Sequence, residues 1–184
     1  MQVRNDYGNY VGGGFEQDSF LKFDFSGISQ ATRIKKATLH LMYYHWQNNN
    51  PAGRILSLYR VNNNWNEDTL LWNNQPSYQI NPTDNSMVPA NFGWMTWNVT
   101  NDVKGFLNGT LDNFGWKLSD SVYWGGYNIP CTFFYAKENR VYIPYIELEP
   151  ISVVYIDDDF NSTTPGSGND NFNHIQEANN AVAE

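Results

Sequence analysis

Two aromatic clusters are the residues of this chain best suited to contacting a ligand. Tyr44 and Trp46 lie at the end of an expected strand, and Trp124 and Tyr127 lie around a pair of glycines in a loop. A sugar offers apolar C–H faces rimmed by hydroxyls, so flat rings stack on it and planar polar groups bind its edges. We expect Trp124 and Tyr127 to be exposed stacking groups; the alternative is that they cover a sheet edge.

Four basic side chains could bind the carboxylates of an acidic glycan. Arg54 and Arg140 offer a planar pair of donors that matches a carboxylate, and Lys22 and Lys137 offer point charges. A side chain of this kind is more often a solvated surface charge than a ligand group. The sequence leaves both interpretations open.

Residues that could catalyse a reaction are sparse. The three histidines have no serine or cysteine signature of a nucleophile near them. A carboxylate pair could form from Glu67 with Asp68 or from Glu147 with Glu149, but adjacent or alternating acids in β-proteins are usually solvated or structural. We therefore expect this domain to be non-catalytic, with glycan cleavage by the domain itself as a less favoured alternative.

Hard oxygen ligands for calcium are concentrated in one acidic loop. Residues 157–159 are three aspartates, followed by Asn161, Asn169 and Asp170. The spacing is not that of an EF-hand, so a solvated acidic loop is the alternative to a structural calcium ion. We expect no other cofactor. Cys131 is the single cysteine, so it forms no intramolecular disulfide and is expected to be a small buried apolar residue.

The amino-acid composition limits the kinds of binding partner that this chain could have. Charged residues make up 16% of the chain and aromatic residues another 16%, a balance that suits extracellular β-proteins. Residues 1–150 carry 13 acids and 11 bases, whereas residues 151–184 carry 6 acids and no base. With no basic stripe and no apolar run near the roughly 20 residues of a membrane helix, we expect neither nucleic-acid binding nor membrane insertion. The chain is expected to be an internal fragment of a larger secreted protein.

The elements that must position these residues are strands, because the dominant periodicity is two. Leu39, Leu41 and Tyr43 alternate with more polar neighbours, as expected for a strand with one buried face. The expected strands cover residues 19–26, 37–46, 55–61, 94–99, 115–118, 132–136 and 145–148. Gly, Asn and Pro clusters separate them, which predicts an all-β antiparallel sandwich of the jelly-roll kind. One short helix, residues 101–107 with Thr100 as its cap, completes the domain.

Tryptophans inside the expected strand phrases are predicted to fill the core. They are Trp65, Trp72, Trp94, Trp97 and Trp116. After residue 150 the composition changes to a strand at 153–156, an acidic Gly-rich loop and a helix at 173–183. Such a segment buries little by itself. We expect domain 1–150 to be followed, at 151–184, by a linker and the start of another domain.

Five phrases, in order, carry a family resemblance. They are FLKFDFS at 20–26, ATLHL at 37–41, LYRV at 58–61 with WNED at 65–68, LWNNQP at 71–76, and GW at 93–94 with WNVT at 97–100. Together they resemble the DNRLRE or disaggregatase-related repeat family. The tail, VYIDDD at 154–159 and HIQEA at 174–178, is similar to the start of a right-handed β-helix of the pectate-lyase kind.

The resemblance implies a jelly-roll module of secreted and surface-layer proteins, abundant in methanogenic archaea, beside β-helix domains. It supplies no catalytic residue. We expect a polysaccharide-binding module, extracellular or at the cell surface, that targets an attached β-helix polysaccharide-degrading domain to a matrix glycan. The alternative is a structural spacer or adhesion repeat of an archaeal cell envelope.

Overall fold

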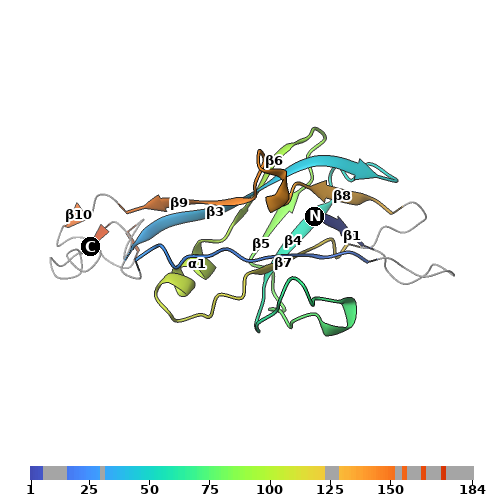
Figure 1. Cartoon of the computed structure of the whole chain (residues 1–184). Coiled ribbons are helices and arrows are strands. Elements are labelled where there is room, and N and C mark those ends of the chain that lie inside the picture. The colour runs from blue at the N-terminus through green and yellow to red at the C-terminus, as the bar shows by residue number, and fades with distance from the viewer. Residues whose placement is uncertain are drawn as a thin grey trace. The chain divides into compact units, whose positions relative to one another are not determined.

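In the computed structural model, the period-two pattern of the sequence forms strands joined by loops, and the described residues contain one α-helix (Figure 1). The structure describes residues 1–5, 16–29, 32–122, 129–151, 155–156, 163–164 and 171–172. The strands are β1 (Gln2–Arg4), β2 (Ser19–Leu21), β3 (Ile34–Gln47), β4 (Ile55–Arg60), β5 (Asp84–Met87), β6 (Gly93–Asn98), β7 (Trp116–Ser119), β8 (Cys131–Phe134), β9 (Tyr145–Pro150), β10 (Tyr155–Ile156) and β11 (Asn171–Phe172). The helices are α1 (Thr100–Leu107) and the 3₁₀ turns η1 (Trp72–Asn74) and η2 (Lys137–Asn139).

Two antiparallel sheets account for most of these strands. One has five strands in the order β1-β8-β3-β6, with β9 also paired to β3, and the other has four in the order β2-β7-β4-β5. They form a sandwich-like fold, which confirms the predicted all-β class. β10 and β11 form a separate two-stranded parallel sheet.

β3 shows how the sequence selects the two faces of a sheet. Leu39, Leu41 and Tyr43 are buried, while His40 is half-buried and Tyr44 is exposed, as the alternation predicts. The register against β8 shifts between Tyr43 and His45, so a β-bulge lies at Tyr44. The polar side of β3 therefore faces away from the core up to the bulge.

The sandwich core is filled by large side chains from both sheets. Trp97 of β6 and Trp116 of β7 are fully buried, as predicted. The indole N–H of Trp97 donates to the Leu56 carbonyl of β4 at 3.1 Å, which joins the two sheets and satisfies a buried polar group.

Core packing was the wrong prediction for Trp72 and Trp94, which are both exposed. Trp94 belongs to the face of β6 opposite to Met95 and Trp97, and the period of two places it outside. Trp72 lies in the η1 turn rather than a strand. Trp65 is half-buried.

The chain divides into two compact units, each built from separated segments. Unit 1 comprises Met1–Phe23, Leu39–Asn98 and Asn113–Ile146, and unit 2 comprises Asp24–Thr38, Val99–Asp112 and Glu147–Glu184. Unit 1 contains every strand of the four-stranded sheet and most of the five-stranded sheet.

Unit 2 contains α1. The prediction that Thr100 caps the N-terminus of this helix is wrong. Thr100 is the first residue of the helix, and its side-chain oxygen accepts the Ala37 backbone N–H at 2.9 Å instead of capping the helix. Val103 and Leu107 are buried, as the amphipathic pattern requires. No helix within the described residues is long and apolar enough to cross a membrane.

Candidate functional site

A row of aromatic rings extends over the outer face of the five-stranded sheet, all of it within unit 1. The centroid separations are 4.0 Å for Tyr44 and Tyr135, 5.3 Å for Tyr135 and Tyr142, 6.3 Å for Tyr142 and Trp94, 5.2 Å for Trp94 and Tyr145, and 4.4 Å for Tyr145 and His40. We call these six residues the aromatic ladder. Each ring packs on the next, so the ladder is organised before any ligand arrives.

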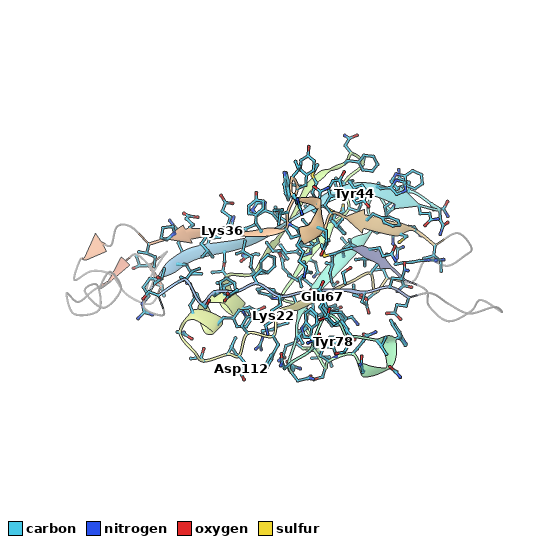
Figure 2. The ribbon with its side chains drawn as sticks, in the orientation of Figure 1. Lys22, Lys36, Tyr44, Glu67, Tyr78 and Asp112 are labelled. Carbon is cyan, nitrogen blue, oxygen red and sulfur yellow. The ribbon has the colours of Figure 1, made fainter. Side chains whose placement is uncertain are left out.

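Four rings of the ladder are open to solvent. Their exposed fractions are 36% for Tyr44, 39% for Tyr142, and 42% each for Trp94 and Tyr145. Figure 2 shows Tyr44 on one side of the sandwich and Tyr78 on the other. Such a set of exposed rings on one sheet face is unusual for a surface that contacts only water.

Three strands bring the ladder residues to one face. His40 and Tyr44 come from β3, Trp94 from β6 and Tyr145 from β9. On β3 and β6 the same alternation that buries the core residues turns these rings outward. Tyr135 follows β8, and its N–H donates to the Met42 carbonyl at 3.1 Å, which fixes it beside β3.

A built turn between Tyr135 and Tyr142 completes the ladder. The side-chain oxygen of Asn139 accepts the backbone N–H of Tyr142 at 2.8 Å and that of Val141 at 3.3 Å. Arg140 adopts the left-handed conformation, with φ 64°, at the corner of this turn. The turn therefore presents the Tyr142 ring from a fixed backbone.

The same turn carries two of the predicted basic residues. Lys137 and Arg140 are both exposed, and the Lys137 ammonium pairs with the Glu67 carboxylate. This pair is exposed on both sides, so it contributes little to stability and a ligand carboxylate could compete for Lys137. Tyr44 is thus a ring of the ladder, and Lys137 and Arg140 lie in the turn between Tyr135 and Tyr142.

Of the other predicted residues, Lys22 and Trp46 are described by the structure and are not among the ladder rings. Lys22 is exposed, with its Nζ 6.0 Å from the Phe114 ring centroid. Trp46 is half-buried and lies near the C-terminal end of β3, two residues after Tyr44. Trp124 and Tyr127 lie outside the described residues.

Arg54 has a role in the fold that sequence alone did not show. It is buried, and its Nε and Nη2 donate to the two oxygens of Asp120 at 2.6 Å and 2.7 Å. It also donates to the Val122 carbonyl. This paired geometry satisfies a buried charge, so a ligand at Arg54 would have to compete with Asp120.

A second buried ion pair lies on the outer side of the four-stranded sheet. Lys117 Nζ is 2.7 Å from Asp18 Oδ2 and 4.1 Å from the Tyr78 ring centroid. Burial disfavours the ammonium, but the hydrogen bond and charge of Asp18 and the Tyr78 side chain outweigh it, so the pKa of Lys117 is raised. The pair anchors the segment that contains Tyr78.

Cys131 is buried, as predicted, and burial raises the pKa of its thiol to about 11. At neutral pH it is a protonated, unreactive side chain. Within the described part of the chain, no three or more His, Cys, Asp or Glu side chains gather as a metal site. The acidic loop at 157–159 lies outside that part.

The sequence alone did not identify several ladder residues as candidate ligand-binding residues. Trp94 could have been recognised, because its alternation with Met95 already placed it on the opposite face of β6 from the core. Tyr145 likewise begins an expected strand. Tyr135 and Tyr142 could not have been recognised from the sequence, because the turn that aligns them with β3 depends on contacts between distant segments.

An antiparallel sandwich that presents a row of mutually packed, exposed aromatic rings on one sheet face has the features of a carbohydrate-binding module. The comparison with protein families agrees. The model of carbohydrate-binding module family 96 matches residues 1–148, and the chain belongs to that family. A comparison with curated proteins finds no match. The predicted carbohydrate-binding class is confirmed, whereas the disaggregatase-related name and the β-helix neighbour stay predictions.

Proposed function

We propose that this chain is a non-catalytic module that binds a polysaccharide along the aromatic ladder. The observation that carries the proposal is the row of mutually packed rings from Tyr44 to His40, stacked at both ends and edge-to-face around Trp94, with four exposed rings. Because neighbouring rings already hold each other, little side-chain freedom is lost on binding. Sugar rings of one chain could lie against the exposed parts of these four rings.

An acidic glycan suits the charges beside the ladder. Lys137 and Arg140 lie in the turn that presents Tyr142, and both are exposed. An arginine fork or an ammonium near a stacked sugar would bind its carboxylate or sulfate. Glu138 in the same turn is an opposing charge, so the preference for acidic polymers should be moderate and should weaken with salt.

Affinity electrophoresis tests the binding proposal. The probes are polygalacturonate, chondroitin sulfate and mixed-linkage β-glucan, which represent carboxylated, sulfated and neutral chains. We expect at least one acidic polymer to retard the protein, and Tyr142→Ala to reduce that retardation. Ile80→Ala, a change at an exposed residue of another segment, is the control and should behave as the wild type. Migration that no polymer alters would contradict the proposal.

The tail supports a role as a tether. β10 and β11 pair in parallel, with Tyr155 opposite Asn171 and Ile156 opposite Phe172. Parallel pairing of segments separated by one short connection is how successive coils of a β-helix stack. In this proposal the module holds an extracellular polysaccharide-degrading β-helix at its matrix substrate and raises its effective concentration there. Sequencing the gene downstream tests this: an absence of further β-helix coils would contradict it.

A structural calcium ion in the acidic loop at 157–159 is part of the same proposal. Thermal melting with calcium and with a chelator tests it. We expect calcium to raise the melting temperature, and equal melting temperatures would contradict the site.

The second candidate function is a structural or adhesion repeat of a cell envelope. The observation that favours it is the aliphatic side chains beside the ladder, since Val141 and Ile143 are exposed next to Tyr142. Aliphatic groups lack the flat face that stacks on sugars and are common in protein contacts. Self-association in analytical ultracentrifugation, together with no binding to any polymer, would favour this function.

A further inference from the structure

Residues 62–79 form a second surface feature, which we call the η1 loop. It lies within unit 1, and its aromatic residues pack on the outer side of the four-stranded sheet, while Glu67 near its start pairs with Lys137 of the turn beside the ladder. Tyr78 lies 5.3 Å from the Tyr59 ring of β4, and Trp65 lies 5.6 Å from the Phe20 ring of β2. Phe20, Lys117 and Tyr59 are neighbours in register on that side of the sheet.

Side-chain hydrogen bonds hold the η1 loop in one shape. The amide oxygen of Asn62 accepts from Gln79 Nε2, that of Asn63 from the Ser77 N–H, and that of Asn66 from the Asp68 N–H, each at 2.8 Å. The Trp65 indole N–H donates to the Phe114 carbonyl at 2.8 Å. At the tip, Asn74 accepts the Leu71 N–H and donates to the Thr69 carbonyl. The tip is therefore ordered without any help from a ligand.

This ordered tip presents Trp72 to solvent. Its exposed fraction is 60%, higher than that of any ring in the ladder, and the neighbouring Leu71 is 63% exposed. Among the described residues, the Trp72 ring makes no aromatic contact and its indole N–H makes no hydrogen bond. In contrast, Trp65 and Trp97 both use their indole N–H within the fold. An exposed indole on a pre-formed turn has the properties of a binding group.

The chemistry around Trp72 selects the kind of ligand. Residues 69–80 contain no charged side chain, and the indole is followed by Asn73, Asn74 and Gln75. Asn74 is used by the turn, but Asn73 is exposed with an amide that makes no hydrogen bond to the described residues. A flat apolar ring beside a planar amide matches the C–H face and the hydroxyl edge of a sugar.

We propose that Trp72, with Asn73, is a second sugar-stacking contact, separate from the ladder and neutral in its preference. This inference rests on the proposed function, because it takes the same polysaccharide as its ligand. Two contacts over different sheets cannot both be filled by a short oligosaccharide that is bound at the ladder. A long polymer, or neighbouring chains of a matrix, can fill both, and the second contact then adds avidity.

The test compares polymer with oligosaccharide and uses matched variants. Wild type, Trp72→Ala and Leu71→Ala are compared on the polymer that retards the wild type most among the three named above. Tetrasaccharides of that polymer are then titrated while the indole N–H signals are followed by NMR. The Trp72 signal is the one missing from the spectrum of Trp72→Phe. Since Trp72 makes no hydrogen bond to the described residues, its removal should leave the melting temperature unchanged.

We expect Trp72→Ala to weaken polymer binding about tenfold and Leu71→Ala to leave it unchanged. The Trp72 indole signal should shift at high tetrasaccharide concentration, even in a Trp94→Ala/Tyr142→Ala variant. An unshifted signal together with full polymer binding by Trp72→Ala overturns the second contact and leaves the ladder intact. Equal losses of polymer binding in Leu71→Ala and Trp72→Ala would show that the apolar tip as a whole, rather than stacking on the Trp72 ring, carries the effect, and would also overturn it. If no polymer retards the wild type, the proposed function fails and this inference fails with it.

Discussion

Replacing Trp94 by alanine should weaken polysaccharide binding about tenfold. A tryptophan side chain can bury up to about 250 Å². Trp94 is 42% exposed, so about 100 Å² of its surface is open to a ligand. A sugar ring that covers half of this area removes about 50 Å² from water, worth about 1.3 kcal/mol at about 25 cal/mol per Å². A loss of that size changes Kd about tenfold.

Isothermal titration calorimetry with an oligosaccharide of the bound polymer measures this change. The fold should survive, because Trp94 contacts the surface rings of Tyr145, Tyr142 and His40, and their loss should lower the unfolding free energy by about 1 kcal/mol. Ile80→Ala serves as the surface control. A folded Trp94→Ala protein whose Kd stays within twofold of the wild type would refute the ladder as the binding surface.

Four further predictions concern the fold that holds this surface. Lys117→Ala should lower the unfolding free energy by about 3–5 kcal/mol in urea titrations, because it leaves the Asp18 carboxylate buried without its partner. In the wild type, the pKa of Lys117 is raised in the folded state, so its ion pair contributes its full stabilisation below about pH 10.4. This stabilisation should be lost as the pH rises through the folded-state pKa. A urea midpoint that does not change between about pH 9 and about pH 12 would argue against it. Gly115→Ala should destabilise by more than about 3 kcal/mol, since φ is +75° and the new Cβ would lie 2.0 Å from the Leu21 carbonyl oxygen. Cys131 should react with a thiol reagent at neutral pH only after unfolding, because its pKa is about 11; rapid labelling of the folded protein would contradict its burial.

The sequence predicted most strands, including the short β7 and β8, and missed β1, β5 and β11. β3 and β6 have an alternating pattern that needs no partner to be recognised. β5 is polar, with the sequence DNSM, and pairing with β4 in register makes it a strand. Asp84 also accepts the Asn98 N–H at 2.6 Å, a contact between segments that no local pattern reveals. Local periodicity identifies a strand only where one face is consistently apolar.

The candidate site was predictable only in part, for a related reason. Tyr44 was identified from its place at a strand end, and the structure puts it in the ladder. Arg54 was considered a ligand group because its partner Asp120 lies 66 residues away in the sequence. The ladder itself depends on β9 and the η2 turn reaching β3, so it arises from topology rather than from any one motif.

The most direct test of the account is an NMR map of the aromatic side chains during titration with a bound oligosaccharide. We predict that the largest shifts fall on Trp94, Tyr142 and Tyr145, with smaller ones on Tyr44 and none on the buried Trp97. Saturable binding that leaves all the ladder rings unshifted would contradict the central claim.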